Sequence, residues 1–323
     1  MDLRACRSAA ALLPLLLWTS CGGSSATAPS KTVPTGSVTA TVFYDENGDG
    51  SAAGEGVRVP DVRVEVAGKT AMSVKGTGQA VVAGVPAGSY PVNVGRDTLP
   101  PFFTFSRTVT VGVPQPEGQE VGVPLTLPIG ANRPNTYLAF GDSITHGDGS
   151  SDEMGYRGRL QQMLQQQLGR ATIFDEGQPS SKSAHGADRI GSQLDRYRPA
   201  YVLIHYGTND YNRQGCPPDC QTPENIRIMI RQARAAQTLP FVATIIPVNP
   251  DLSPDGRIQW VASTNERIRT VARDEGAVLV DLYAAFLKET SLPALFSDHI
   301  HPNDRGYTIM ATEFFKAITG PAR

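Results

Sequence analysis

The first half of the chain alternates short runs of apolar and polar residues. Between residues 37 and 127 these runs are separated by Gly, Pro and Asp, and the clearest are 38–43, 62–66 and 109–111. Because successive side chains of a strand point to opposite faces, this pattern is typical of half-buried strands. No helical period is visible there. Residues 37–127 are therefore predicted to form a small all-β sandwich.

From residue 137 the pattern changes to compact apolar runs separated by longer segments with helical spacing. The apolar runs are 137–140, 171–174, 201–206, 241–246 and 277–280, and the helical segments are 156–168, 224–237, 258–275 and 304–318. Fully apolar strands that alternate with helices indicate a parallel sheet covered by helices on both faces. The prediction is an α/β domain over residues 136–320 with a five-stranded parallel sheet. Residues 128–135 are the expected linker.

The N-terminus has the features of an export signal. Arg4 and Arg7 precede an apolar run at 9–18, which is too short to span a bilayer as a stable helix. The ending WTSC at 18–21 resembles a bacterial lipobox, in which the Cys is acylated, although a lipobox usually has Leu at the position of the Trp. Cleavage by an ordinary signal peptidase is the alternative.

These features predict a signal peptide at 1–20 and a flexible tether at 21–36, which is rich in Ser, Thr, Ala, Pro and Gly. Acylated Cys21 would anchor the protein to a membrane surface without spanning it. We therefore expect an exported bacterial lipoprotein, periplasmic or at the cell surface.

Export changes how the remaining cysteines are interpreted. Cys6 would leave with the signal, so Cys216 and Cys220 remain, in the segment CPPDC. In an oxidising compartment this pair is expected to form a local disulfide. A zinc site is the alternative, but no further Cys or His follows nearby.

The composition excludes one class of partner. Charged residues make up 19% of the chain and hydrophobic residues 40%, which is ordinary for a packed soluble protein. The net charge is −2 and the Lys and Arg residues are scattered. No electrostatic feature therefore points to nucleic acid.

Candidate chemistry begins directly after the first apolar run of the α/β domain, where the sequence is GDSIT. Ligands of open α/β sheets bind beyond the carboxyl ends of the strands, so Ser143 is placed to act as a nucleophile. Backbone N–H groups at such a turn can hold an anion. The motif G-x-S-x-G of the α/β-hydrolases is absent, because Thr145 stands two residues after Ser143.

A serine nucleophile needs a base and a group that orients the base. The segment SDHIHP supplies both, since Asp298 precedes His301 by three residues and could bond one ring nitrogen. The segment GTND follows the third strand, and the amide of Asn209 could donate to an oxyanion. Asp142 and Asp210 are expected to brace these loops by hydrogen bonds to the backbone.

The blocks GDSIT, GTND and DHIHP, in this order and after these strands, resemble those of the SGNH hydrolase superfamily, also called GDSL esterases. The likeness covers about residues 136–318. It implies a flavodoxin-like three-layer sandwich and a Ser–His–Asp triad of Ser143, His301 and Asp298. It also implies an oxyanion hole and no catalytic metal or cofactor.

By this resemblance the oxyanion hole consists of the Ser143 N–H, a Gly N–H and the Asn209 amide. The Gly is placed at Gly177, after the second strand, with Gly186 as the alternative. The family usually has an Asn before this Gly and a small polar residue plus Gly after it, whereas Pro179 stands here.

The resemblance leans toward the acetylesterase and lysophospholipase-like branches. It implies an exported esterase that removes short acyl groups, such as acetyl, from carbohydrates. The alternatives are a lipase, lysophospholipase or thioesterase for longer acyl chains, and a surface binding protein without activity. The expected partners are an ester substrate, glycan or lipid, and the membrane surface. Specificity is expected in the loops at 146–156, 178–190, 211–223 and 247–257.

The N-terminal module carries a second candidate site, DENGDG, with oxygen ligands at Asp45, Asn47 and Asp49 as in calcium loops. An EF-hand would need flanking helices and Glu at its twelfth position, where Gly56 stands. The surrounding sequence resembles prealbumin-like B-type repeats of bacterial surface proteins, some of which bind calcium at this turn. A structural calcium and a solvated hairpin turn are both open.

Overall fold

The structure is a computed structural model and describes residues 33–212 and 221–322. The signal peptide with Cys21, and the pair Cys216 and Cys220, lie outside the described residues, so export, acylation and the disulfide stay predictions. Within the part of the chain that is described, no helix is long and apolar enough to cross a membrane.

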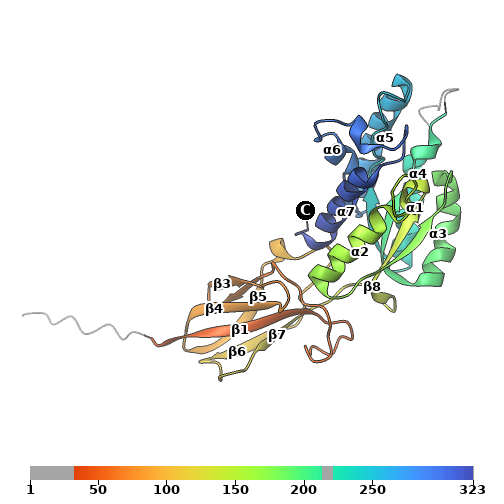
Figure 1. Ribbon diagram of the computed structural model, residues 1–323. Helices are drawn as coiled ribbons and strands as arrows, with labels where there is room; N and C mark the ends of the chain where they lie inside the picture. Colours follow the sequence, from red (N-terminus) through yellow and green to blue (C-terminus); the bar gives the residue numbers. More distant parts are fainter. Residues whose placement is uncertain (1–32, 213–220, 323) are drawn as a thin grey trace, which may run out of the picture. The chain divides into compact units, whose positions relative to one another are not determined.

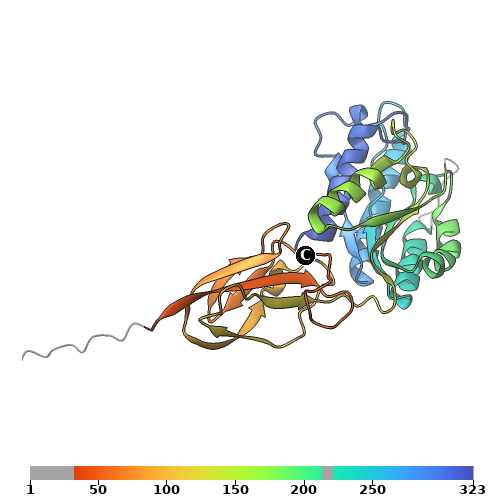
Figure 2. The same cartoon turned by 60° about the horizontal axis from the view of Figure 1, so that its bottom comes forward.

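The N-terminal module is all-β, as predicted. Its strands form a three-stranded sheet in the order β4-β1-β7 and a four-stranded sheet in the order β3-β2-β5-β6 (Figure 1; Figure 2). The strands are β1 (Thr35–Tyr44), β2 (Arg63–Val66), β3 (Lys69–Met72), β4 (Gln79–Pro86), β5 (Gly88–Val94), β6 (Val109–Val113) and β7 (Val121–Leu125). Buried Val residues from both sheets share one core, which is the arrangement of a sandwich.

The second half of the chain contains the predicted five-stranded parallel sheet. Its strands are β8 (Arg133–Gly141), β9 (Thr172–Gly177), β10 (Pro199–His205), β11 (Leu239–Ala243) and β12 (Val278–Val280). Their order is β12-β11-β10-β8-β9, and every neighbouring pair is parallel. In the order of the chain this is strand order 2-1-3-4-5, the flavodoxin-like order, so the fold prediction is confirmed.

Helices cover both faces of this sheet (Figure 1). One face carries α2 (Gly155–Leu168), α6 (Leu282–Phe286) and α7 (Asp304–Thr319), and the other carries α3 (Ser183–Tyr197), α4 (Thr222–Ala235) and α5 (Asp255–Asp274). The helix that follows β8 therefore packs on the opposite face from the helix that follows β10. In sheets of this type, ligands bind at the carboxyl ends of the two strands from which the helices diverge.

One expectation was wrong: residues 178–190 are not simply a loop, because α3 begins at Ser183. Its buried face consists largely of small residues, Ser183, Gly186 and Ala187, before Ile190 and Leu194. Small residues hide the apolar period that identifies a helix in a sequence. Gly186 is needed for packing, since an added Cβ would lie 2.7 Å from the Tyr206 ring.

The turn after β8 contains a carboxyl group that is fully buried. Asp142 is the N-cap of α1 (Ser143–His146), and its Oδ1 accepts the Ile144 N–H at 3.0 Å, which confirms its expected bracing role. Its Oδ2 is buried and has no hydrogen-bond partner among the described residues. Burial, with help from the nearby charges of Asp210 and Asp148, raises the pKa of Asp142 to about 7 despite the Ile144 bond.

We expect Asp142→Asn to stabilise the protein, and more so at pH 8 than at pH 5. The pKa of Asp142 is about 7 when folded against 3.8 unfolded, so the folded state binds more protons between these values. The free energy of unfolding therefore falls as pH rises through this range, by on the order of 4 kcal/mol. Asn keeps the Oδ1 acceptor and never ionises. Melting temperatures of both proteins at the two pH values measure the effect.

Asp195→Asn is the matched control, because Asp195 is exposed on α3. It should leave the pH dependence of melting as it is in the unmodified protein. An equal gain of Asp142→Asn at both pH values would contradict the assignment of a buried, proton-binding carboxyl.

Candidate active site

The nucleophile candidate is held at a tight turn between β8 and α1. Ser143 is the first residue of α1 and only 4% of its surface is exposed. The preceding Gly141 has no room for a side chain, since an added Cβ would lie 2.1 Å from Thr145 Oγ1 and 2.4 Å from the His205 carbonyl oxygen. This close approach explains why the turn needs Gly at that position.

Ser143, His301 and Asp298 form a continuous hydrogen-bonded chain. Ser143 Oγ lies 2.9 Å from His301 Nε2, although the two residues are 158 positions apart. His301 Nδ1 lies 2.6 Å from Asp298 Oδ2. With an ionised Asp298 accepting from Nδ1–H, Nε2 is the nitrogen that can accept the Ser143 proton.

The loop that carries the histidine also fixes the carboxylate. Asp298 Oδ1 accepts the backbone N–H groups of Ile300 at 2.8 Å and His301 at 2.7 Å. Burial alone would raise the pKa of Asp298, but the hydrogen bonds from the His301 side chain and from these two N–H groups outweigh it and lower the pKa. Asp298 is therefore ionised at neutral pH and favours a positive charge on His301.

Asn209 lies in the short 3₁₀ helix η2 (Thr208–Asp210) that follows β10. Its side-chain Nδ2 donates to the Ser181 carbonyl at 3.1 Å, which leaves the second N–H of the amide for another acceptor. Asp210 braces this region as expected: Oδ1 accepts the Ser183 N–H at 3.0 Å and Oδ2 accepts the Thr222 hydroxyl at 2.6 Å.

Gly177 lies at the end of β9, but its N–H already has an acceptor. It donates to Asp175 Oδ1 at 2.9 Å. The other oxygen of Asp175 lies 3.2 Å from both His146 Nδ1 and Arg157 Nη2. Position 177 must be Gly because an added Cβ would lie 2.2 Å from the His146 nitrogen. The structure therefore shows a packing reason for this Gly and a competing partner for its N–H.

Arg189 was not identified as a site residue from the sequence, and the structure places it beneath the strand ends. Its side chain is 8% exposed and pairs with Glu176 Oε2 at 2.7 Å. It also donates to the carbonyls of Glu176 and Gly141 and to the Tyr206 hydroxyl. One guanidinium thus ties together the ends of β8 and β9 and the residue after β10. The sequence lacked a signal for this Arg, because the small residues of α3 hide the helix face on which it lies.

The other histidines are not placed to activate Ser143. His205 is fully buried, and burial lowers the pKa of this histidine to about 4. His146 bonds Asp175, and His185 Nδ1 lies 3.1 Å from Ser181 Oγ. The side chain of His299 is half exposed. Within the described residues, Ser143 Oγ is hydrogen-bonded to a histidine only at His301.

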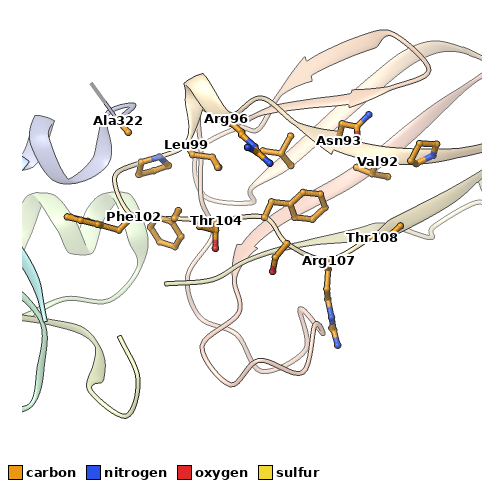
Figure 3. A pocket seen from close by; sticks show the side chains of 15 residues that line it. Val92, Asn93, Arg96, Leu99, Phe102, Thr104, Arg107, Thr108 and Ala322 are labelled. Atoms are coloured by element: carbon orange, nitrogen blue, oxygen red, sulfur yellow. The ribbon is translucent and has the colours of Figure 1, made fainter. Parts of the chain in front are cut away.

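A cavity of about 640 Å³ lies elsewhere, in the N-terminal module (Figure 3). It is lined mainly by residues of the segment 91–108, among them Arg96, Leu99 and Phe102. Neither Ser143 nor His301 belongs to it, so this cavity is distinct from the candidate active site.

Known proteins that resemble this chain match it in the α/β domain. The model of the GDSL-like lipase/acylhydrolase family matches residues 139–309, more than half of the chain. Esterase TesA of Pseudomonas aeruginosa is 26% identical over 148 residues, which are 46% of this chain and 70% of that protein. The family match does not reach the N-terminal module, so the resemblance to prealbumin-like repeats stays a prediction.

Two solved structures are also similar to this chain. Axe2, an acetylxylan esterase from Geobacillus stearothermophilus, has a TM-score of 0.49 and 20% identity, covering 58% of this chain and 95% of its own. A GDSL-like lipase from Bacteroides thetaiotaomicron has a TM-score of 0.47 and 22% identity, covering 57% of this chain and 87% of its own. On the family match across more than half of its length, the chain belongs to the GDSL-like lipase/acylhydrolase family and is a carboxylic ester hydrolase.

Proposed function

We propose that the protein is a serine esterase in which Ser143 attacks the ester, His301 is the base and Asp298 orients His301. The observation that carries this proposal is the unbroken chain of hydrogen bonds from Ser143 Oγ through the His301 ring to Asp298. This arrangement is the geometry by which a serine nucleophile is recognised.

In the first half of the reaction His301 Nε2 takes the Ser143 proton while Oγ bonds to the ester carbonyl carbon. The carbonyl oxygen becomes an oxyanion, which the Ser143 N–H and the free N–H of the Asn209 amide stabilise. The carbon–oxygen bond to the alcohol then breaks, and His301 returns its proton to the leaving alcohol. Water, deprotonated by His301, then attacks the acyl carbon. The bond from that carbon to Ser143 Oγ breaks, His301 returns the proton to Ser143, and the acid leaves.

We propose short acyl esters on carbohydrates as the substrate class. The loops that follow β8 and β9 are polar: 147–153 reads GDGSSDE and 178–182 reads QPSSK. Such loops offer hydrogen-bonding groups to sugar hydroxyls and little apolar surface for a long acyl chain.

Hydrolysis of longer acyl chains is the second candidate. Leu252 is 61% exposed and Met154 is 46% exposed, and they lie in the loops 247–257 and 146–156 that are expected to set specificity. Exposed large apolar side chains in such loops are what a lipase or thioesterase would use.

We expect the protein to hydrolyse p-nitrophenyl acetate with a higher kcat/KM than p-nitrophenyl esters of longer chains up to palmitate. Ser143→Ala should abolish the hydrolysis of all of them, while Ser263→Ala, on the exposed side of α5, should not change it. A maximum at long chains would favour the second candidate. No hydrolysis of any ester by the unmodified protein would favour a surface binding protein.

Asn209→Ala should lower kcat by about 10²–10³-fold, since losing one side-chain donor to an oxyanion typically costs about 2.7–4 kcal/mol of the barrier. KM and the melting temperature should change little, because the amide makes one recorded hydrogen bond, to Ser181. Steady-state kinetics with p-nitrophenyl acetate measure the change. Turnover close to that of the unmodified protein would remove Asn209 from the mechanism.

We also propose a structural calcium ion at the DENGDG turn of the N-terminal module. Asp45 is 4% exposed, its Oδ2 accepts the Gly50 N–H at 3.0 Å, and its buried Oδ1 has no hydrogen-bond partner among the described residues. A cation would satisfy this oxygen.

Besides the carboxylates of Asp45 and Asp49, the remaining ligands would have to be amide, backbone or solvent oxygens. Across residues 33–212 and 221–322, no cluster of three or more His, Cys, Asp or Glu side chains could hold a metal. Asn47 Oδ1 and Asp49 Oδ1 accept backbone N–H groups of the turn, as they would in a solvated hairpin. The turn therefore has features of both alternatives.

Added calcium should raise the melting temperature, and Asp49→Ala should abolish the shift. Glu117→Ala, an exposed acidic residue of the same module, should retain it. No shift in the unmodified protein would favour the solvated turn.

Export and acylation at Cys21 are further proposals, which rest on the sequence.

A further inference from the structure

The loop between β9 and α3 contains a backbone N–H group that the described residues leave without an acceptor. The Gln178 N–H donates to the Gly141 carbonyl at 2.9 Å, and the Ser181 N–H donates to the Gln178 carbonyl at 3.1 Å. The Ser183 N–H donates to Asp210 at 3.0 Å. Between them, the Ser180 N–H donates to no group of the described residues, and Ser180 is exposed.

Ser180 also has a backbone conformation that its residue type disfavours. Its φ is +64°, and it follows Pro179 in a turn closed by the bond from Ser181 to Gln178. Proline at the second position and a positive φ at the third are the features of a type II turn, which normally has Gly or Asn at the third. Non-glycine residues held in this conformation cluster at functional sites. The turn itself does not use the N–H of its third residue.

Two hydrogen bonds fix this turn between the other groups of the site. Asn209 Nδ2 donates to the carbonyl of Ser181, the residue after Ser180. The Gln178 N–H holds the start of the turn to Gly141, two residues before Ser143. Ser180 is thus attached on one side to the strand that carries the nucleophile and on the other to the amide proposed to hold the oxyanion.

The N–H of Gly177 is less suited to donating to an oxyanion. Its N–H donates to a carboxylate oxygen of Asp175 at 2.9 Å, so an oxyanion at that place would compete with a full negative charge for the donor. The oxyanion would also lie close to the negative charge of Asp175, which repels it. Arg157 and His146 contact the other oxygen of Asp175, and they hold the carboxylate where it is.

We propose that the Ser180 N–H, and not the Gly177 N–H, is the further backbone donor of the oxyanion hole, beside the Ser143 N–H and the Asn209 amide. This inference rests on the proposed role of Ser143. The sequence does not indicate this role for Ser180, because Gly or Asn usually stands where a turn needs a positive φ, and neither stands at this position.

The test is a crystal structure of the protein after reaction with diethyl p-nitrophenyl phosphate. Ser143 Oγ would bond to phosphorus, p-nitrophenolate would leave, and the hydroxyl proton would pass to His301. The phosphoryl oxygen of the adduct occupies the place of the oxyanion. We expect this oxygen within about 3.1 Å of the nitrogens of Ser180, Ser143 and Asn209 Nδ2, the distance of an oxyanion donor. The Gly177 N–H should still donate to Asp175.

A phosphoryl oxygen that accepts from Gly177 and not from Ser180 would overturn the inference. Failure of Ser143 to form any adduct, with unchanged p-nitrophenyl acetate hydrolysis, would instead overturn the proposed function. The two failures are therefore distinguishable.

Backbone substitution tests the same point by kinetics. Replacing Ser180 by glyceric acid removes only its N–H, and replacing Gly177 by glycolic acid is the matched control. The change at 180 should lower kcat by about 10²–10³-fold, and the change at 177 by less than about tenfold. KM should change little in both. The reverse order of the two effects would overturn the inference.

Discussion

The hydrogen bond between Ser143 Oγ and His301 Nε2 joins residues 158 positions apart, and the proposed chemistry depends on it. Neither residue could reach the other without the parallel sheet, which ends β8 and β10 at the same edge and in register, with Gly141 opposite His205. The helices α2 and α4, which follow these strands, pack on opposite faces of the sheet, and ligands of such sheets bind at the strand ends where the helices diverge. Within the loop that carries His301, two backbone N–H groups hold Asp298 in place, and Asp298 in turn orients the imidazole.

This edge is assembled at a cost in stability. Asp142 is buried next to Ser143, and its Oδ2 has no hydrogen-bond partner among the described residues. His205 is also buried, and neither of its ring nitrogens has a partner there. Burial favours the neutral form of both groups: it raises the pKa of Asp142 and lowers the pKa of His205. Buried polar groups without partners destabilise a fold, and they are tolerated most often where function requires the local geometry. Arg189 offsets part of this cost, since its guanidinium satisfies two carbonyls and a hydroxyl beneath the same edge.

The sequence was sufficient for the strands, because each contains a compact apolar run, and the alternation of these runs with helical segments predicted the parallel sheet. It was insufficient for α3, whose buried face begins with Ser183, Gly186 and Ala187. It placed Ser143, His301 and Asp298 because side-chain chemistry is visible in residue names. Backbone chemistry is not: the acceptor of the Gly177 N–H and the positive φ of Ser180 follow from tertiary contacts. Motif spacing therefore points to candidate catalytic side chains, whereas candidate N–H donors are visible only in the structure.

The proposed reaction requires the site to stabilise a transient anion although several carboxylates lie near it, and each carboxylate is kept from opposing that anion in a different way. Asp298 is turned toward His301, where its charge favours the protonated imidazole. Asp175 is paired with Arg157 and His146, and Asp210 is occupied by the Ser183 N–H and the Thr222 hydroxyl. Asp142 has no such partner, and burial instead favours its neutral form. Two N–H donors then face no competing carboxylate. They are the second N–H of the Asn209 amide and the N–H of Ser180. The same reasoning makes a donor already bound to a carboxylate, as at Gly177, a poor member of an oxyanion hole.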